Sequence, residues 1–222
     1  MASIPVLYED NHLLIVNKPA TWVVQGAAAD QLSLLDWGKA YLKEKYHKPG
    51  NVYLGVVSRL DSWVTGAVPF ARTSKAAARI NEQLRESTVL KLYWAIAEAK
   101  PDEPSGTLVH WLVRDDREAI TRAFARQQPQ SQRGELRYRT MGETDRGTLL
   151  EIELITGRKH QIRAQLATLG CPIVGDRKYG AATRMEEGIG LHCRRLAFDH
   201  PTQEQKIDIV APLPSYWPKL PD

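Results

Sequence analysis

The chain has 222 residues, of which 43% are hydrophobic and 25% charged. Its 30 Lys and Arg against 26 Asp and Glu leave a formal net charge of +4. These values fit a globular protein of one catalytic-size domain or two small ones, and they exclude a collagen-like repeat and a largely disordered chain. Two cysteines exclude a disulfide scaffold, and the longest apolar runs fall far short of the roughly 20 residues that a membrane helix needs.

The first hundred residues predict short strands and two helices. Met1–Pro5 has no basic segment leading into an apolar stretch, so we see no secretory signal and expect the protein to be cytoplasmic. Apolar residues spaced along one face predict the helices, and short apolar runs bounded by turn residues predict the strands. We expect strands at 5–9, 13–16, 54–57, 67–71 and 89–97, and helices at 31–46 and 74–86.

The rest of the chain continues the strand pattern and adds one helix. Residues 115–134 are polar and rich in Gln and Arg, so we interpret them as a long insertion loop, a kind of segment that is often functional. Many strands with few helices between them predict an α+β fold with a mixed, largely antiparallel central sheet and flanking helices. We expect strands at 107–113, 136–141, 148–155, 191–198 and 206–210, and a helix at 159–169.

Arginines gather in the stretch Arg114–Arg139, which holds seven of them against four acidic residues. Clustered arginines suit bidentate contacts with phosphate groups, so this composition permits a polyanionic partner. A solvated face of mixed charge explains the same composition equally well. Composition alone leaves both interpretations open.

Several cysteines and histidines of the C-terminal third raise the question of a metal site. They are Cys171, Cys193, His160, His192 and His200. Their spacing matches none of the paired patterns that put two ligands on one turn, so we expect no bound metal. The two cysteines are expected to be small core residues.

Two segments stand out once the common enzyme signatures are excluded. The sequence has no nucleophile-elbow serine, no P-loop, no dinucleotide-binding glycine motif and no zinc-protease helix motif. In Ser58–Gly66 a carboxylate follows an arginine just after an apolar strand, although a structural Arg/Asp pair in a turn explains this too. In Thr156–Leu166 a glycine ends a strand and a helix begins among cations, which favours a phosphate site but also fits a helix with a charged outer face.

These segments and several others give the chain a resemblance to the RluA family of RNA pseudouridine synthases along nearly its whole length. Residues 59–61 (Arg-Leu-Asp) with Gly66 look like the family's catalytic H-R-L-D-x-x-T-S-G loop. Residues 91–95 resemble its K-x-Y-x-A strand. Further similar blocks, in the family's order, lie at 6–20, 156–180, 191–201 and 211–214.

The resemblance implies the fold and the reaction. We expect the pseudouridine synthase fold with a catalytic cleft, as a single catalytic domain over 1–222 without the N-terminal RNA-binding module of many relatives. The implied activity is the isomerisation of a specific uridine in structured RNA, either rRNA or tRNA, to pseudouridine. RNA is the implied partner, and the resemblance implies no cofactor, no metal, no membrane and no protein partner.

The same resemblance assigns roles to four residues. Asp61 is expected to be the catalytic carboxylate, and Arg163 is expected to pair with it. Tyr93 is expected to lie against the target uracil. Arg59 is expected either to occupy the space left by the flipped nucleotide or to hold its backbone.

Two departures from the family's loop keep an alternative open. Ser58 stands where the family usually has His, and Val64-Thr65 replaces Thr-Ser. A non-catalytic RNA-binding relative is therefore the alternative from another class. A base N-glycosidase, which also uses a single carboxylate, is a further alternative and would release the free base.

Overall fold

The computed structural model describes residues 4–28 and 30–221, which divide into two compact units. The expectation about a secretory signal concerns in part Met1–Ser3, which lie outside the described ranges. None of the described helices is long and apolar enough to cross a membrane. The first unit comprises Met1–Val89 and Arg194–Leu213, and the second comprises Leu90–Cys193 and Pro214–Asp222.

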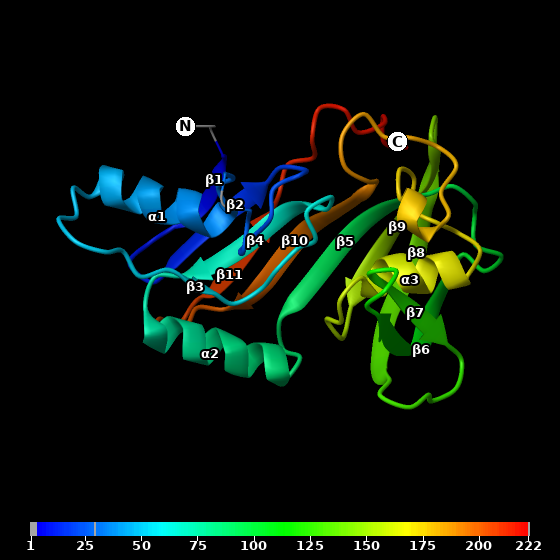
Figure 1. The fold of residues 1–222 in the computed structure, drawn as a ribbon, viewed down its shortest axis with the longest axis horizontal. Coiled ribbons are helices and arrows are strands. Elements are labelled where there is room, and N and C mark those ends of the chain that lie inside the picture. The colour runs from blue at the N-terminus through cyan, green and yellow to red at the C-terminus, as the bar shows by residue number, and fades with distance from the viewer. Residues whose placement is uncertain (1–3, 29, 222) are drawn as a thin grey trace. The chain divides into compact units, whose positions relative to one another are not determined.

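The first unit is built on six strands: β1 (Val6–Glu9), β2 (Leu13–Lys18), β3 (Gly55–Val56), β4 (Thr65–Ala71), β10 (Leu191–Asp199) and β11 (Lys206–Val210). The order is β1-β2-β4-β10, with β3 pairing β4 and β11 pairing β10 (Figure 1). β1 with β2, β2 with β4, β3 with β4 and β10 with β11 are antiparallel pairs. β10 begins in the second unit and enters the first at Arg194. β2 and β4 bury almost every residue and form the centre of this unit's core.

Two capped helices complete the first unit, α1 (Leu34–Lys45) and α2 (Ser74–Arg85). Ser33 caps α1 in a capping box, because its hydroxyl accepts the N–H of Asp36 while the Asp36 carboxylate accepts the N–H of Ser33. Thr73 caps α2 by accepting the N–H of Ala76 at 3.1 Å. α2 packs against β3 and β4 (Figure 1).

The second unit contains a five-stranded antiparallel sheet: β5 (Leu90–Ala97), β6 (Ser105–Asp115), β7 (Ile120–Phe124), β8 (Gln132–Thr144) and β9 (Gly147–Leu154). The strand order is β5-β9-β8-β6-β7. The helix α3 (Gln161–Thr168) packs against β6 and β7, and a short 3₁₀ helix, η1 (Arg177–Tyr179), lies beside α3 (Figure 1).

The predicted α+β class with a largely antiparallel sheet is confirmed, and one element prediction is wrong. Residues 115–134 do not form a long loop, because β6 runs to Asp115, β7 occupies 120–124 and β8 starts at Gln132. β7 is an edge strand, paired only through β6 among the described strands, and most of its residues stay partly solvated. The one buried residue of β7 is the polar Thr121, and its neighbour Arg122 is exposed, so the strand shows no apolar alternation that would stand out in the sequence.

The two cysteines are buried free thiols, as the sequence predicts. Among the described residues, no group of three or more His, Cys, Asp or Glu is placed to hold a metal ion. His200 instead has a structural partner, since its Nε2 lies 2.7 Å from Asp10 Oδ2. Its Nδ1 accepts the N–H groups of Thr202 and Gln203, so the turn between β10 and β11 is fixed to the start of β2.

Candidate active site

The segment Ser58–Gly66 comprises most of the loop between β3 and β4 and the first two residues of β4, and it carries the predicted catalytic carboxylate. Leu60 and Val64 are buried, at 9% and 3% exposure, and the N–H of Val64 donates to the carbonyl of Asp61 at 3.1 Å. Two apolar anchors therefore fix a tight turn, and they leave Asp61 partly exposed between them. Arg59, next to the first anchor, is exposed.

Lys18 holds this loop through its buried side chain, a role that the sequence analysis did not predict. Its side chain is 1% exposed, and its Nζ donates to the carbonyls of Pro19, Trp22 and Ser62 at 2.9, 2.8 and 2.8 Å. Burial lowers the pKa of Lys18 to about 7, while the negative charge of Asp61 opposes that shift. The sequence gives only a weak signal for this burial, because Lys18 follows the apolar run 13–16 after Asn17 and precedes a proline.

Tyr93 lies on β5, where it pairs in register with Ile152 of β9. Its side chain is 7% exposed. Side chains alternate along a strand, so Lys91 shares its face, whereas Trp94 points to the other face and donates its indole N–H to Glu151 at 3.3 Å. Tyr93 is thus a rigidly placed aromatic residue with a small accessible surface.

Arg163 is a buried arginine in the first turn of α3 with a buried carboxylate partner. Its Nε and Nη2 donate to Asp176 Oδ2 and Oδ1 at 2.6 and 2.8 Å, which is a bidentate pair. The side chains of Arg163 and Asp176 are 4% and 1% exposed. The guanidinium carbon also lies 4.8 Å from the ring centroid of Tyr179, within cation–π range. The sequence analysis placed Asp176 and Tyr179 in a matching block but gave them no role.

Tyr179 connects this arginine to the strand β7. Its hydroxyl accepts the N–H of Thr121 at 2.7 Å and lies 2.9 Å from Nδ1 of His160. Thr121 in turn donates its hydroxyl to the carbonyl of Lys159 at 2.9 Å. His160 precedes α3 in a left-handed conformation, with φ of 54°. The start of α3 is therefore fixed from two directions, and with it the position of Arg163.

The structure places the four predicted residues in two sets. Asp61 and Arg59 belong to the first unit, together with Lys18, and Tyr93 and Arg163 belong to the second, together with Asp176. Tyr93 and Arg163 are buried, Asp61 is partly exposed, and Arg59 is exposed. The ion pair between Asp61 and Arg163 stays a prediction.

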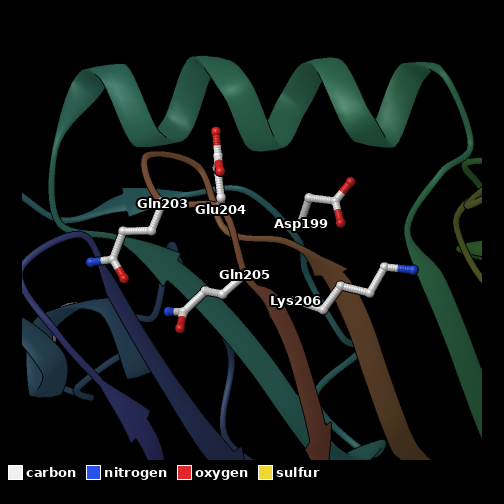
Figure 2. A pocket seen from close by; sticks show the side chains of 5 residues that line it. All are labelled: Asp199, Gln203, Glu204, Gln205 and Lys206. Carbon is white, nitrogen blue, oxygen red and sulfur yellow. The ribbon is translucent and has the colours of Figure 1, made fainter.

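A surface pocket lies elsewhere, at the turn between β10 and β11 (Figure 2). The turn is tied to α2, since Gln83 donates its side-chain amide to the carbonyl of Asp199 and accepts the N–H of the same residue, both at 2.9 Å. None of the predicted site residues lines this pocket, so it has no part in the site. The lining residues are Asp199, Gln203, Glu204, Gln205 and Lys206.

Comparison with known proteins identifies the family. Residues 12–168 match the family described as RNA pseudouridylate synthase. The chain is 34% identical over 213 residues to the uncharacterized RNA pseudouridine synthase YhcT of Bacillus subtilis, covering 95% of this chain and 68% of the relative. It is 30% identical to the ribosomal large subunit pseudouridine synthase C of Vibrio cholerae, covering 95% of this chain and 66% of that protein.

A solved structure agrees with this assignment. The human RNA pseudouridylate synthase domain containing 4 superposes with a TM-score of 0.79 at 27% identity, covering 96% of this chain and 89% of that one. The chain is therefore an enzyme of the pseudouridine synthase class, an isomerase. It belongs to the RNA pseudouridylate synthase family, and within it to the RluA family that the sequence motifs resemble.

Proposed function

We propose that the protein converts a specific uridine of structured RNA, in rRNA or tRNA, to pseudouridine, with Asp61 as the catalytic carboxylate. Family membership supports the reaction, and the relative from Vibrio cholerae is named for the large ribosomal subunit. The single observation that carries the site assignment is the placement of Asp61. It is a partly exposed carboxylate on a turn that Leu60, Val64 and Lys18 hold in place.

The reaction needs a carboxylate at this kind of position. The bond between N1 of uracil and C1′ of ribose breaks, and a bond between C5 and C1′ forms after the base has turned. C5 loses a proton and N1 gains one, so the atoms balance without a cofactor. Cleavage develops positive charge on the sugar, which an ionised carboxylate stabilises. Asp61 acts either on C1′ of the ribose or by removing a proton at C2′.

Arg163 is proposed to pair with Asp61 and to orient it. An arginine has five N–H donors, and Asp176 engages one on Nε and one on Nη2. A guanidinium can bind more than one carboxylate through its further N–H donors. The expected distance between a side-chain nitrogen of Arg163 and an oxygen of Asp61 is within about 4 Å. A crystal structure of the protein with RNA measures it directly.

Tyr93 gives a prediction that separates its hydroxyl from its ring. Tyr93→Phe should keep RNA binding and lose most of its turnover if the hydroxyl takes part in proton transfer. Tyr93→Ala should in addition lose base stacking, typically about 1–3 kcal/mol per base. Rates of pseudouridine formation and RNA affinities of both variants check this. Near-wild-type rates in both variants would show that Tyr93 has only a structural role in the sheet.

The arginines around β7 are proposed to contact RNA outside the reacting nucleotide. Arg122, Arg126 and Arg133 changed together to Ala should weaken RNA binding and flatten its dependence on salt, since each phosphate contact on a single strand contributes a slope of about 0.7. Arg122 and Arg133 already pair with Asp115 and Glu135, at 3.2 and 2.6 Å, so part of their charge is compensated. Unchanged affinity and slope would remove this segment from the RNA interface.

One experiment tests the proposed function as a whole. Pseudouridines are mapped across the total RNA of cells with and without the protein, and at least one site is expected to vanish in its absence. Purified protein is then assayed on that RNA. Release of free uracil, detected by chromatography, would favour the glycosidase alternative. Binding without any conversion would favour the non-catalytic relative.

A further inference from the structure

Lys91 is a partly buried cation for which the structure provides no counter-ion. It lies on β5, two residues before Tyr93, and among the described residues it has no hydrogen-bond or ion-pair partner. Burial lowers the pKa of its ammonium group, and the thiol of Cys193 opposes this shift. A cation in such surroundings is costly unless something neutralises it.

The strand arginines of the second unit differ from Lys91. Each lies beside a carboxylate, on the neighbouring strand or two residues along the chain, even where it is exposed. The pairs are Arg114–Asp116, Arg122–Asp115, Arg133–Glu135, Arg137–Glu153 and Arg139–Glu151. In the second unit, strand arginines that water could solvate thus have a carboxylate partner. Lys91, whose ammonium group is poorly solvated, has none among the described residues.

The amine of Lys91 lies beside the open backbone of Gly157. A Cβ added at Gly157 would lie 3.7 Å from Lys91 Nζ, with no other heavy atom within 4 Å apart from its chain neighbours. Gly157 is exposed and does not have a positive φ, so its backbone conformation does not require glycine. Close approach of a ligand is one of the recurring uses of glycine, and the open space at Gly157 fits it. The two residues that follow, Arg158 and Lys159, are exposed cations.

We propose that Lys91 and the open backbone of Gly157 form a subsite that binds a phosphate group of the RNA strand carrying the target uridine. The ligand class is a phosphodiester, whose charge supplies the counter-ion that Lys91 lacks. Residues two apart on a strand lie on one face about 7 Å apart. The subsite thus adjoins Tyr93, and it binds the backbone next to the nucleotide that Tyr93 is proposed to contact. This inference rests on the proposed function only in taking RNA as the substrate.

Two variants and a control test the subsite by binding of a short oligouridylate at several salt concentrations. Lys91→Met should weaken binding about fivefold at about 0.1 M salt and reduce the salt slope by about 0.7, the contribution of one phosphate. Lys91→Arg should keep the slope. Gly157→Val should reproduce the loss with the lysine still present, because the added side chain covers the amine. Gly50→Val is the matched control, since Gly50 is also exposed, with open space around it and no positive φ.

Steady-state kinetics on an RNA that the wild type modifies then distinguish a loss of phosphate binding from a loss of the chemical step. The loss of kcat/KM in Lys91→Met and Gly157→Val should come through KM, because a phosphate carries the same charge before and during the reaction. A fall in kcat with unchanged affinity would overturn the subsite and place Lys91 on the reacting base. Unchanged affinity and slope in both variants would overturn it as well. If the wild type modifies no RNA while the slopes change as expected, the proposed function fails and the phosphate subsite stands.

Discussion

Asp61→Asn is expected to reduce pseudouridine formation to less than about one hundredth of the wild-type rate, which corresponds to at least about 2.7 kcal/mol of lost transition-state stabilisation. The amide has nearly the shape of the carboxylate, so the substitution removes the charge and little else. Folding should be preserved, because the turn depends on the buried Leu60 and Val64 and on the Asp61 backbone carbonyl. RNA affinity should be preserved too, since a carboxylate repels phosphate groups and contributes nothing to binding them.

The matched control is Asp30→Asn, because Asp30 is an exposed aspartate of the same unit outside the loop. It should retain wild-type rates. Rates are measured as conversion of the mapped uridine under single-turnover conditions, so that product release does not hide the chemical step. Activity of Asp61→Asn above about one part in a hundred would contradict the assignment of Asp61. In that case the family's loop, altered here at Ser58 and Val64, would no longer mark the catalytic group.

The sequence predicted the parts of the site that lie in local patterns. The segments 58–66 and 156–166 each combine a strand end, a turn and charged residues within about ten positions, so their chemistry is visible without knowing the fold. The strands that frame them were predicted for the same reason, because β2, β4 and β5 are apolar and bounded by turn residues. Strands that stay partly solvated are harder to predict from the sequence, and β7 was interpreted as part of a loop for that reason.

The partners of the site residues could not be predicted, since they depend on tertiary contacts. Asp176 lies 13 positions after Arg163, beyond the end of α3, and nothing local requires the two to meet. Thr121 reaches Tyr179 across 58 positions. Lys18 posed a different difficulty, because lysine is almost always solvated and a hydrophobic pattern therefore counts it as the end of a strand. Its place between an apolar run and a proline is a weak sign of burial, and the carbonyls that bind its amine are known only from the structure.

Lys18→Met should destabilise the first unit and change how its stability depends on pH. Methionine fills a similar volume but leaves the carbonyls of Pro19, Trp22 and Ser62 without their donor, at a cost of about 2–4 kcal/mol in the free energy of unfolding. Urea denaturation measures the loss. Lys48→Met, at an exposed lysine of the same unit, is the control and should change stability little.

The pH dependence identifies the cause of that loss. In the folded protein the pKa of Lys18 lies at about 7, below its value of 10.5 in the unfolded chain. Between these values the unfolded state binds more protons, so wild-type stability should rise with pH from about 7 to about 9, by at most about 1.4 kcal/mol per pH unit. Lys18→Met lacks the titrating group and should lack this rise, and the stability difference between the two proteins should grow with pH. Because the charge of Asp61 raises the pKa of Lys18, Asp61→Asn should move the start of the rise to lower pH. Parallel pH profiles for the wild type and Lys18→Met would show that Lys18 is not the buried titrating group, and that the loop carrying Asp61 is held by its apolar anchors alone.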